Sequence, residues 1–199
     1  MVEHLGPAYF SAEDFNAIVQ TICGFSGSQS ASLRQAAAYG IGVVAEHGGD
    51  AFAACADLCL TSLKSAIDYA MTPKVEAKQM KVTQYHHARD NAIASIGKIL
   101  KFRQTYINSN PQVAAQLVQY WLGLLPITHD TEEAQSNYEY LCDFLLEQPQ
   151  FIFGSGDPAA TARQLATIFG EAFQEQYWAE EKTAQQKEKM ALSVRYLMN

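Results

Sequence analysis

Hydrophobic side chains recur along almost the whole chain with the period of an amphipathic α-helix. In the first such segment they occupy positions i, i+3, i+4, i+7 and i+8 between Phe15 and Cys23. No segment alternates apolar and polar residues over five or more positions with enrichment in β-branched residues, so we expect no β-strand. The pattern predicts an all-α protein of eight helices.

Turn and capping residues divide these helices into pairs. Ser11 with Asp14 resembles a capping box, Gly48-Gly49 follows the second helix, and Asn110-Pro111 precedes the fifth. The polar residues 72–84 are interpreted as a long connection within the second pair. We therefore expect a single domain over residues 1–199, built of four helical hairpins at about 9–47, 50–102, 111–147 and 158–198.

Two of the predicted helices contain nearly the same sequence motif. "RQAAAYGIG" runs from Arg34 to Gly42 and "RDNAIASIG" from Arg89 to Gly97, an offset of 89 − 34 = 55 residues. An offset of this size indicates a repeated supersecondary unit, here the 40- to 47-residue period of HEAT or armadillo repeats plus the polar connection. We predict a right-handed α-solenoid of about four HEAT-like hairpins, an α-α superhelix of the ARM/HEAT type.

The repeated positions suggest structural roles. Arg34 and Arg89 are predicted to hydrogen-bond carbonyls or carboxylates of an adjacent hairpin. Gly42 and Gly97 are predicted to let neighbouring helices approach closely, because glycine has no side chain. Cutting a solenoid exposes an apolar face, and we expect exposed hydrophobic residues at this end of the chain among Tyr9, Phe10, Phe15 and Leu33.

Composition and charge limit the partners. The 199 residues are 48% hydrophobic and carry a net charge of −7, which disfavours nucleic acid and anionic membranes and mildly favours basic partners. The longest apolar run, Ala36 to Ala45, is too short for a membrane span, so no membrane insertion is expected. The first ten residues do not resemble a signal peptide.

No catalytic or metal-binding motif is present. We find no P-loop, GxGxxG or GxSxG sequence, and therefore predict no enzyme activity and no cofactor. The four cysteines contain no CxxC pair. Cys55 and Cys59 lie one helical turn apart and could meet His86 and His87, but buried, reduced core thiols are the preferred interpretation. We predict no metal.

Several stretches together resemble a known family. They are "LRQAAAYGIGVVAEHGG" (33–49), "ARDNAIASIGKILKF" (88–102), "WLGLLPITHDTEEA" (121–134) and "YEYLCDFL" (138–145) followed by "IFG". In this order they resemble the C-terminal HEAT repeats of importin-beta nuclear transport receptors (karyopherin beta), nearest to the importin beta-3 or importin-5 branch. The resemblance is strongest over residues 30–154 and weaker outside them.

The resemblance implies a HEAT solenoid that is a C-terminal fragment of a longer receptor. It implies cargo on the concave face, which the second helix of each hairpin forms. Its cargo would be basic proteins such as ribosomal proteins and histones, and nucleoporin Phe-Gly repeats are possible further partners. The family's main site for the GTPase Ran lies in N-terminal repeats, so Ran binding is expected mainly outside this chain. The implied location is the cytoplasm and the nucleus.

Two groups of residues are candidates for a binding surface. Glu139, Asp143 and Glu147 follow i, i+4, i+8 on the sixth helix, and Glu46 and Asp90 lie on the equivalent helices of the first two hairpins. An acidic inner surface would attract Lys/Arg-rich cargo, whereas the alternative is an ordinary solvated face.

The second group is aromatic. Tyr120 and Trp121 could line a pocket for a cargo side chain or a Phe-Gly repeat, although core packing is the better-supported alternative. The predicted function is thus part of a nuclear import receptor that binds basic cargo. A HEAT-repeat scaffold or adaptor subunit unrelated to transport is the alternative.

Overall fold

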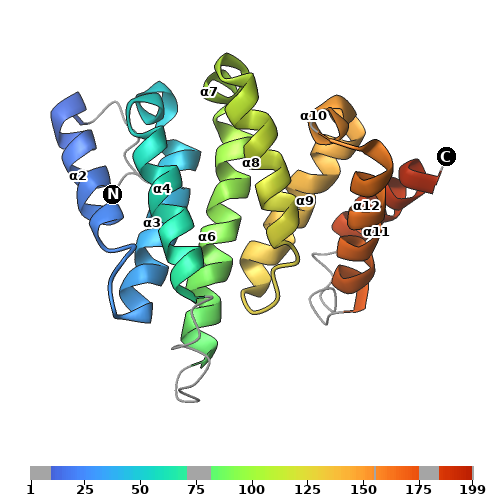
Figure 1. Cartoon of the computed structure of the whole chain (residues 1–199), viewed down its shortest axis with the longest axis horizontal. Helices are drawn as coiled ribbons and strands as arrows, with labels where there is room; N and C mark the ends of the chain where they lie inside the picture. The colour runs from blue at the N-terminus through green and yellow to red at the C-terminus, as the bar shows by residue number, and fades with distance from the viewer. Residues whose placement is uncertain (1–9, 71–81, 155, 175–183, 199) are drawn as a thin grey trace. The chain divides into compact units, whose positions relative to one another are not determined.

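A computed structural model describes residues 10–70, 82–154, 156–174 and 184–198 (Figure 1). Within these ranges the regular elements are all helices, and no strand occurs. The chain divides into two compact units, Met1–Ser109 and Asn110–Asn199. No helix in the described ranges is both long enough and apolar enough to cross a membrane.

The first unit is a two-layer arrangement of helices. Its elements are α2 (Ala12–Gly24), α3 (Ala31–His47), the 3-10 helix η2 (Gly49–Ala54), α4 (Ala56–Ala70), α6 (Val82–Phe102) and α7 (Gln104–Ser109). Helix α2 packs on α3 and α4, while α3 makes its most extensive packing with α6. In Figure 1 α4 lies in front of α3, so α2 and α4 form one layer and α3 and α6 the other.

Local capping explains where these helices begin and end. The Ser11 side chain accepts a hydrogen bond from the backbone N–H of Asp14 at 3.1 Å, which confirms the predicted start of α2. Helix α3 ends at Gly48-Gly49, as predicted. Gly49 has φ = 55°, a left-handed conformation that costs glycine least.

The helices that contain the two repeated motifs lie side by side. Ser95 Oγ donates to the carbonyl of Ala38, 57 residues earlier, at 2.7 Å. Arg103 Nη1 donates to the carbonyl of Gly49, 54 residues earlier. Both separations are close to the 55-residue offset of the repeat. Helices α3 and α6 therefore run parallel, in the register that the repeat predicts.

The second unit repeats the same kind of packing. Its elements are α8 (Pro111–Leu124), α9 (Thr131–Glu147), α10 (Pro149–Phe153), α11 (Pro158–Gln174) and α12 (Ala184–Met198). Helix α9 packs against α12 and α10, and α11 packs against α12. Pro111 occupies the first turn of α8, and the Asp130 side chain caps α9 by accepting from the N–H of Glu133 at 3.2 Å.

The fold class is confirmed: the chain is an all-α protein of the HEAT/ARM type. The sequence did not predict the short elements η2, α7 and α10 as separate helices. Each has only five or six residues, too few to show a helical period. Residues 71–81, most of the expected polar connection, lie outside the described residues, and α6 starts at Val82, three residues before the predicted Tyr85.

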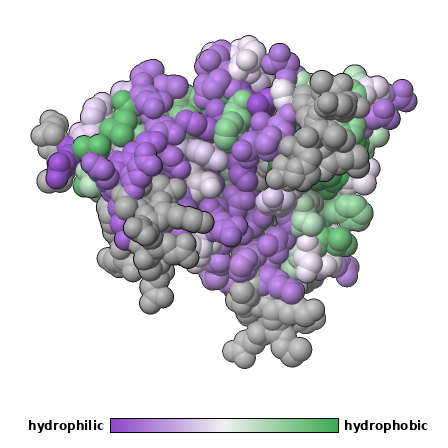
Figure 2. Space-filling view, turned by 180° about the vertical axis from the view of Figure 1, so that it is seen from behind, coloured by the Kyte–Doolittle hydropathy of each residue, from purple (hydrophilic) through white to green (hydrophobic). Residues whose placement is uncertain are grey.

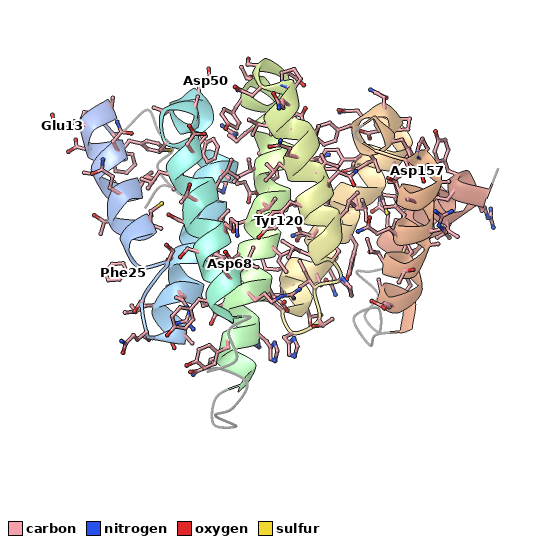
Figure 3. All side chains as sticks on the ribbon, in the orientation of Figure 1. Glu13, Phe25, Asp50, Asp68, Tyr120 and Asp157 are labelled. Atoms are coloured by element: carbon pink, nitrogen blue, oxygen red, sulfur yellow. The ribbon has the colours of Figure 1, made fainter. Side chains whose placement is uncertain are left out.

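The expected apolar surface is only partly found. Leu33 is 43% exposed, as predicted, and Phe10 is half-buried, while Tyr9 lies outside the described residues. The prediction for Phe15 is wrong, because its side chain is 2% exposed and packs beside Gly48 within the first hairpin. Phe25, which the sequence did not single out, is 45% exposed and its ring points outward beyond the end of α2 (Figure 3). In Figure 2 hydrophobic atoms reach the surface on the side where α2 and α3 lie.

Candidate functional site

The acidic residues of α9 are partly neutralised from within the chain. Lys189 of α12 forms ion pairs with Asp143 and, at 3.8 Å between Nζ and Oε1, with Glu139. The Asp143 side chain is only 11% exposed, whereas that of Glu139 is 44% exposed. Glu147, one turn further, is exposed. The three predicted residues share one stripe of α9, but their side chains differ in solvent exposure and therefore in access for a partner.

The packing of α12 on α9 places Lys189 at the acidic stripe. Ser193, one turn after Lys189, is buried and donates to the Lys189 carbonyl at 3.0 Å, and its hydroxyl also contacts Cys142 of α9. Burial alone would lower the pKa of Lys189. The hydrogen bond and charge of Asp143, together with Glu139, outweigh that effect and raise the pKa. Lys189 is therefore held charged beside the two carboxylates.

The two acidic candidates of the first unit lie in different environments. Asp90 is 0% exposed, and its carboxylate lies 3.4 Å from Nη1 of Arg89. Glu46 is half-buried near the end of α3, where its backbone carbonyl accepts from Arg103 Nη2 at 3.4 Å. Asp90 is a core residue here, and only Glu46 of this pair offers side-chain surface.

The two aromatic candidates, Tyr120 and Trp121, also differ in burial. Trp121 is 0% exposed and packs edge-on against Phe144 of α9, with 6.2 Å between ring centroids. Tyr120 is half-buried on α8 (Figure 3). Trp121 therefore belongs to the core of the second unit, which is the packing alternative that the sequence favoured.

Arg34 joins the first two hairpins through ring faces rather than through the predicted hydrogen bonds. Its side chain is 0% exposed, and its guanidinium carbon lies 3.9 Å from the ring centroid of Tyr69 in α4 and 4.9 Å from that of Tyr85 in α6. Nη1 donates to the carbonyl of Ser28, while Nε and Nη2 have no hydrogen-bond partner. Arg89, the second repeated arginine, pairs with its neighbour Asp90.

The repeated glycine of α3 lies at the contact with α6. A Cβ atom placed on Gly42 would lie 2.6 Å from Ser95 Oγ and 3.2 Å from Lys98 Cδ. The first distance is far below a normal van der Waals contact, and the second is tighter than most such contacts. Gly97 is buried at the equivalent position of α6. A side chain at position 42 would therefore collide with α6.

Sequence reasoning missed Arg103, which follows α6. It reaches the end of α3 and the start of η2 by donating to the carbonyls of Glu46 and Gly49. Burial lowers the pKa of Arg103, and the charge of Asp50, at the start of η2 (Figure 3), opposes that shift. The signal that could have found it is an arginine placed one residue beyond the second repeated helix, beside the predicted Gly48-Gly49 turn.

The cysteine positions do not form a metal centre with the neighbouring histidines. Within the described ranges no group of three or more His, Cys, Asp or Glu side chains has an arrangement that could hold a metal ion. All four cysteines are free thiols and buried. The Cys55 thiol donates instead to the carbonyl of Phe52 at 3.2 Å.

The curated proteins similar to this chain include two importins, although no family model matches it. Importin subunit beta-3 of Saccharomyces cerevisiae is 29% identical over 130 residues, which are 65% of this chain and 11% of that protein. A probable importin-5 homolog of Dictyostelium discoideum is 32% identical over 121 residues, 61% of this chain and 10% of that protein. The chain thus spans about a tenth of the length of the curated relatives it matches. Over 61% to 65% of its length, the chain is thus similar to proteins named as importins.

Proposed function

We propose that this chain forms part of a nuclear transport receptor that binds basic protein cargo. The similarity over 65% of the chain to a protein named as an importin carries this proposal. Within it, the chain is a binding module rather than an enzyme, and it moves between cytoplasm and nucleus as part of the receptor. Nucleoporin Phe-Gly repeats are further partners, and Ran binds mainly elsewhere in the receptor.

The exposed acidic residues of α9 are the proposed cargo contact. The carboxylates of Glu139 and Glu147 lie on a different face of α9 from the buried side chains of Leu141 and Leu145. Carboxylates at i and i+8 on one helix face match a cargo segment that carries several Lys or Arg side chains, such as those of ribosomal proteins or histones. Attraction between opposite charges then speeds encounter and fixes orientation more than it adds affinity.

A HEAT-repeat scaffold or adaptor is the second candidate. The observations in its favour are the internal pairing of Asp143 with Lys189 and the complete burial of Asp90. Charges that are satisfied within the protein contribute to its own packing rather than to a partner. In that case the acidic stripe is a structural contact between α9 and α12.

Charge reversal at Glu139 and Glu147 tests the cargo surface. We expect the 199-residue chain to bind a fluorescent Lys/Arg-rich peptide, with affinity that falls as salt rises and drops about tenfold or more in the double variant Glu139→Lys/Glu147→Lys. Fluorescence anisotropy across a salt series measures this. The matched control is Glu13→Lys/Glu171→Lys, which changes the net charge equally at exposed positions outside α9. Equal losses in both variants would contradict a specific surface.

Removal of Lys189 separates the two candidates. If cargo uses this stripe, Lys189 competes with it, and Lys189→Met should raise peptide affinity about threefold to tenfold because Asp143 and Glu139 lose their internal cation. A scaffold predicts no peptide binding in either protein and only a lower melting temperature for the variant. Anisotropy and thermal unfolding of the same samples distinguish these outcomes.

A further inference from the structure

The large hydrophobic side chains that the second unit exposes gather on two neighbouring helices. Among its described residues they are Leu146 of α9 and Leu192 and Tyr196 of α12, with exposed fractions of 38%, 47% and 47%. Helix α12 packs directly on α9. Single exposed hydrophobic residues are common on protein surfaces, but a group on two packed helices is a candidate contact for a partner.

Each of these helices carries an exposed apolar residue two turns after a charged one. Leu146 follows Glu139 by 146 − 139 = 7 residues, and Tyr196 follows Lys189 by 196 − 189 = 7 residues. Residues seven apart lie on nearly the same side of a helix and about 10 Å apart along its axis. Leu192, three residues after Lys189, lies on that side of α12 as well. Each helix therefore has one row that is charged at its start and apolar at its end.

The two rows lie beside each other. Lys189 Nζ lies 3.8 Å from Oε1 of Glu139 and also forms an ion pair with Asp143, so the charged ends of the rows meet. In Figure 1 both α9 and α12 rise along the chain, so the two packed helices run in the same direction and the apolar ends lie on the same side of the charged cluster. We call this the α9–α12 surface, and its residues are Glu139, Asp143, Leu146, Lys189, Leu192 and Tyr196.

We propose that the α9–α12 surface binds partner segments in which an apolar side chain lies about three residues from a basic one. Such a segment is a more specific form of the basic cargo, so this proposal rests on the proposed function. In an extended segment three residues span about 10 Å, which matches the separation of the charged and apolar ends. The basic side chain pairs with Glu139, which is 44% exposed, and the apolar one packs against Leu192 and Tyr196.

The two ends of the surface contribute differently to binding. Exposed carboxylates attract a basic segment and orient it, but water and salt screen them, so they add little affinity. Burial of an aliphatic or aromatic side chain removes apolar area from water and is not screened by salt. Tyr196 suits this contact because a tyrosine ring offers a large area at a low cost in conformational entropy. The apolar end therefore selects among basic segments that the acidic end attracts alike.

Three fluorescent peptides test the apolar requirement on the unmodified 199-residue chain. The first carries two lysines and a phenylalanine three residues away, the second has serine in place of the phenylalanine, and the third has the phenylalanine directly beside the lysines. In fluorescence anisotropy we expect the first to bind about tenfold more tightly than the other two. All three should bind more weakly as salt rises, while the ratio between them stays constant.

Two matched double variants locate the effect. Leu192→Ser/Tyr196→Ser should abolish the difference between the peptides and keep the salt-dependent binding. The control is Leu33→Ser/Tyr39→Ser, which removes a leucine and a tyrosine that are 43% and 46% exposed on α3 of the first unit. It should keep the difference between the peptides. An equal loss in both variants would overturn the assignment of the apolar contact to α12.

The peptide series also separates the apolar requirement from the proposed function. Equal, salt-sensitive binding of all three peptides would overturn the requirement and leave the binding of basic cargo in place, whereas no binding of any peptide would overturn both. Sedimentation at several concentrations tests another occupant. A dimer that Leu192→Ser/Tyr196→Ser dissociates would show that a second copy covers this surface, which would also overturn the proposal. The comparison of peptides on the unmodified chain decides even if a serine variant fails to fold.

Discussion

Replacement of Arg34 by alanine is expected to destabilise the first unit by about 3–4 kcal/mol. The substitution removes a fully buried side chain from between Tyr69 and Tyr85 and deletes the hydrogen bond to the Ser28 carbonyl. Three losses combine: a cavity, two cation–π contacts and a carbonyl left without its donor. Because Tyr69 and Tyr85 belong to α4 and α6, the loss falls on the contact between the first two hairpins.

A second substitution at the same position separates packing from charge. Arg34→Met fills most of the volume and removes a buried cation whose Nε and Nη2 have no hydrogen-bond partner. We therefore expect it to cost less than half of the alanine variant, because replacing a buried charge by an apolar side chain of similar size is often inexpensive. Equal losses for alanine and methionine would show that the cation–π contacts dominate instead.

Hydrogen exchange localises the effect of Arg34. Amides of α3, α4 and α6 should exchange faster in Arg34→Ala, in proportion to the lost free energy. Tryptophan fluorescence serves as an internal control, since both tryptophans, Trp121 and Trp178, lie in residues 110–199. Arg163→Ala is the matched variant, because that arginine is 74% exposed and its ion pair with Asp157 is long, at 3.9 Å. It should change stability by less than about 0.5 kcal/mol.

The sequence predicted the fold well because the fold depends on local patterns. The helical period, the capping residues and the repeated words each act over a few turns, and the 55-residue offset then predicted which helices lie side by side. The Ser95–Ala38 and Arg103–Gly49 hydrogen bonds, 57 and 54 residues apart, follow that offset. Because the local motif is repeated, its offset predicts contacts between residues that are far apart in the sequence.

Contacts between unlike elements could not be predicted in this way. Lys189 reaches Asp143 because α12 packs on α9. The apolar pattern of the last helix is weak, and the sequence did not predict that this helix supplies a cation to the acidic stripe. Phe15 was expected to be exposed, but it is buried within its own hairpin. Each of these features depends on tertiary packing that the repeated motif does not indicate.

Replacement of Gly42 by leucine is expected to destabilise the first unit by about 3 kcal/mol through overpacking. Any Cβ at this position would lie 2.6 Å from Ser95 Oγ, and that oxygen is held by its hydrogen bond to the Ala38 carbonyl at 2.7 Å. Helix α6 would have to move away from α3 or Ser95 would have to give up its bond. Chemical denaturation followed by hydrogen exchange in α3 and α6 measures the loss.

A smaller change at Gly42 identifies the colliding atom. Gly42→Ala should be destabilising, although alanine is ordinarily favoured over glycine inside a helix by about 1 kcal/mol. Adding Ser95→Ala removes the oxygen and leaves the nearest remaining atoms at 3.2 Å or more, so the double variant should be more stable than the sum of the single effects allows. Gly24→Ala is the control, because its Cβ would meet nothing within 4 Å. Strict additivity at positions 42 and 95 would mean that the two helices adjust around the new methyl group, and that the close approach of α3 and α6 does not depend on glycine.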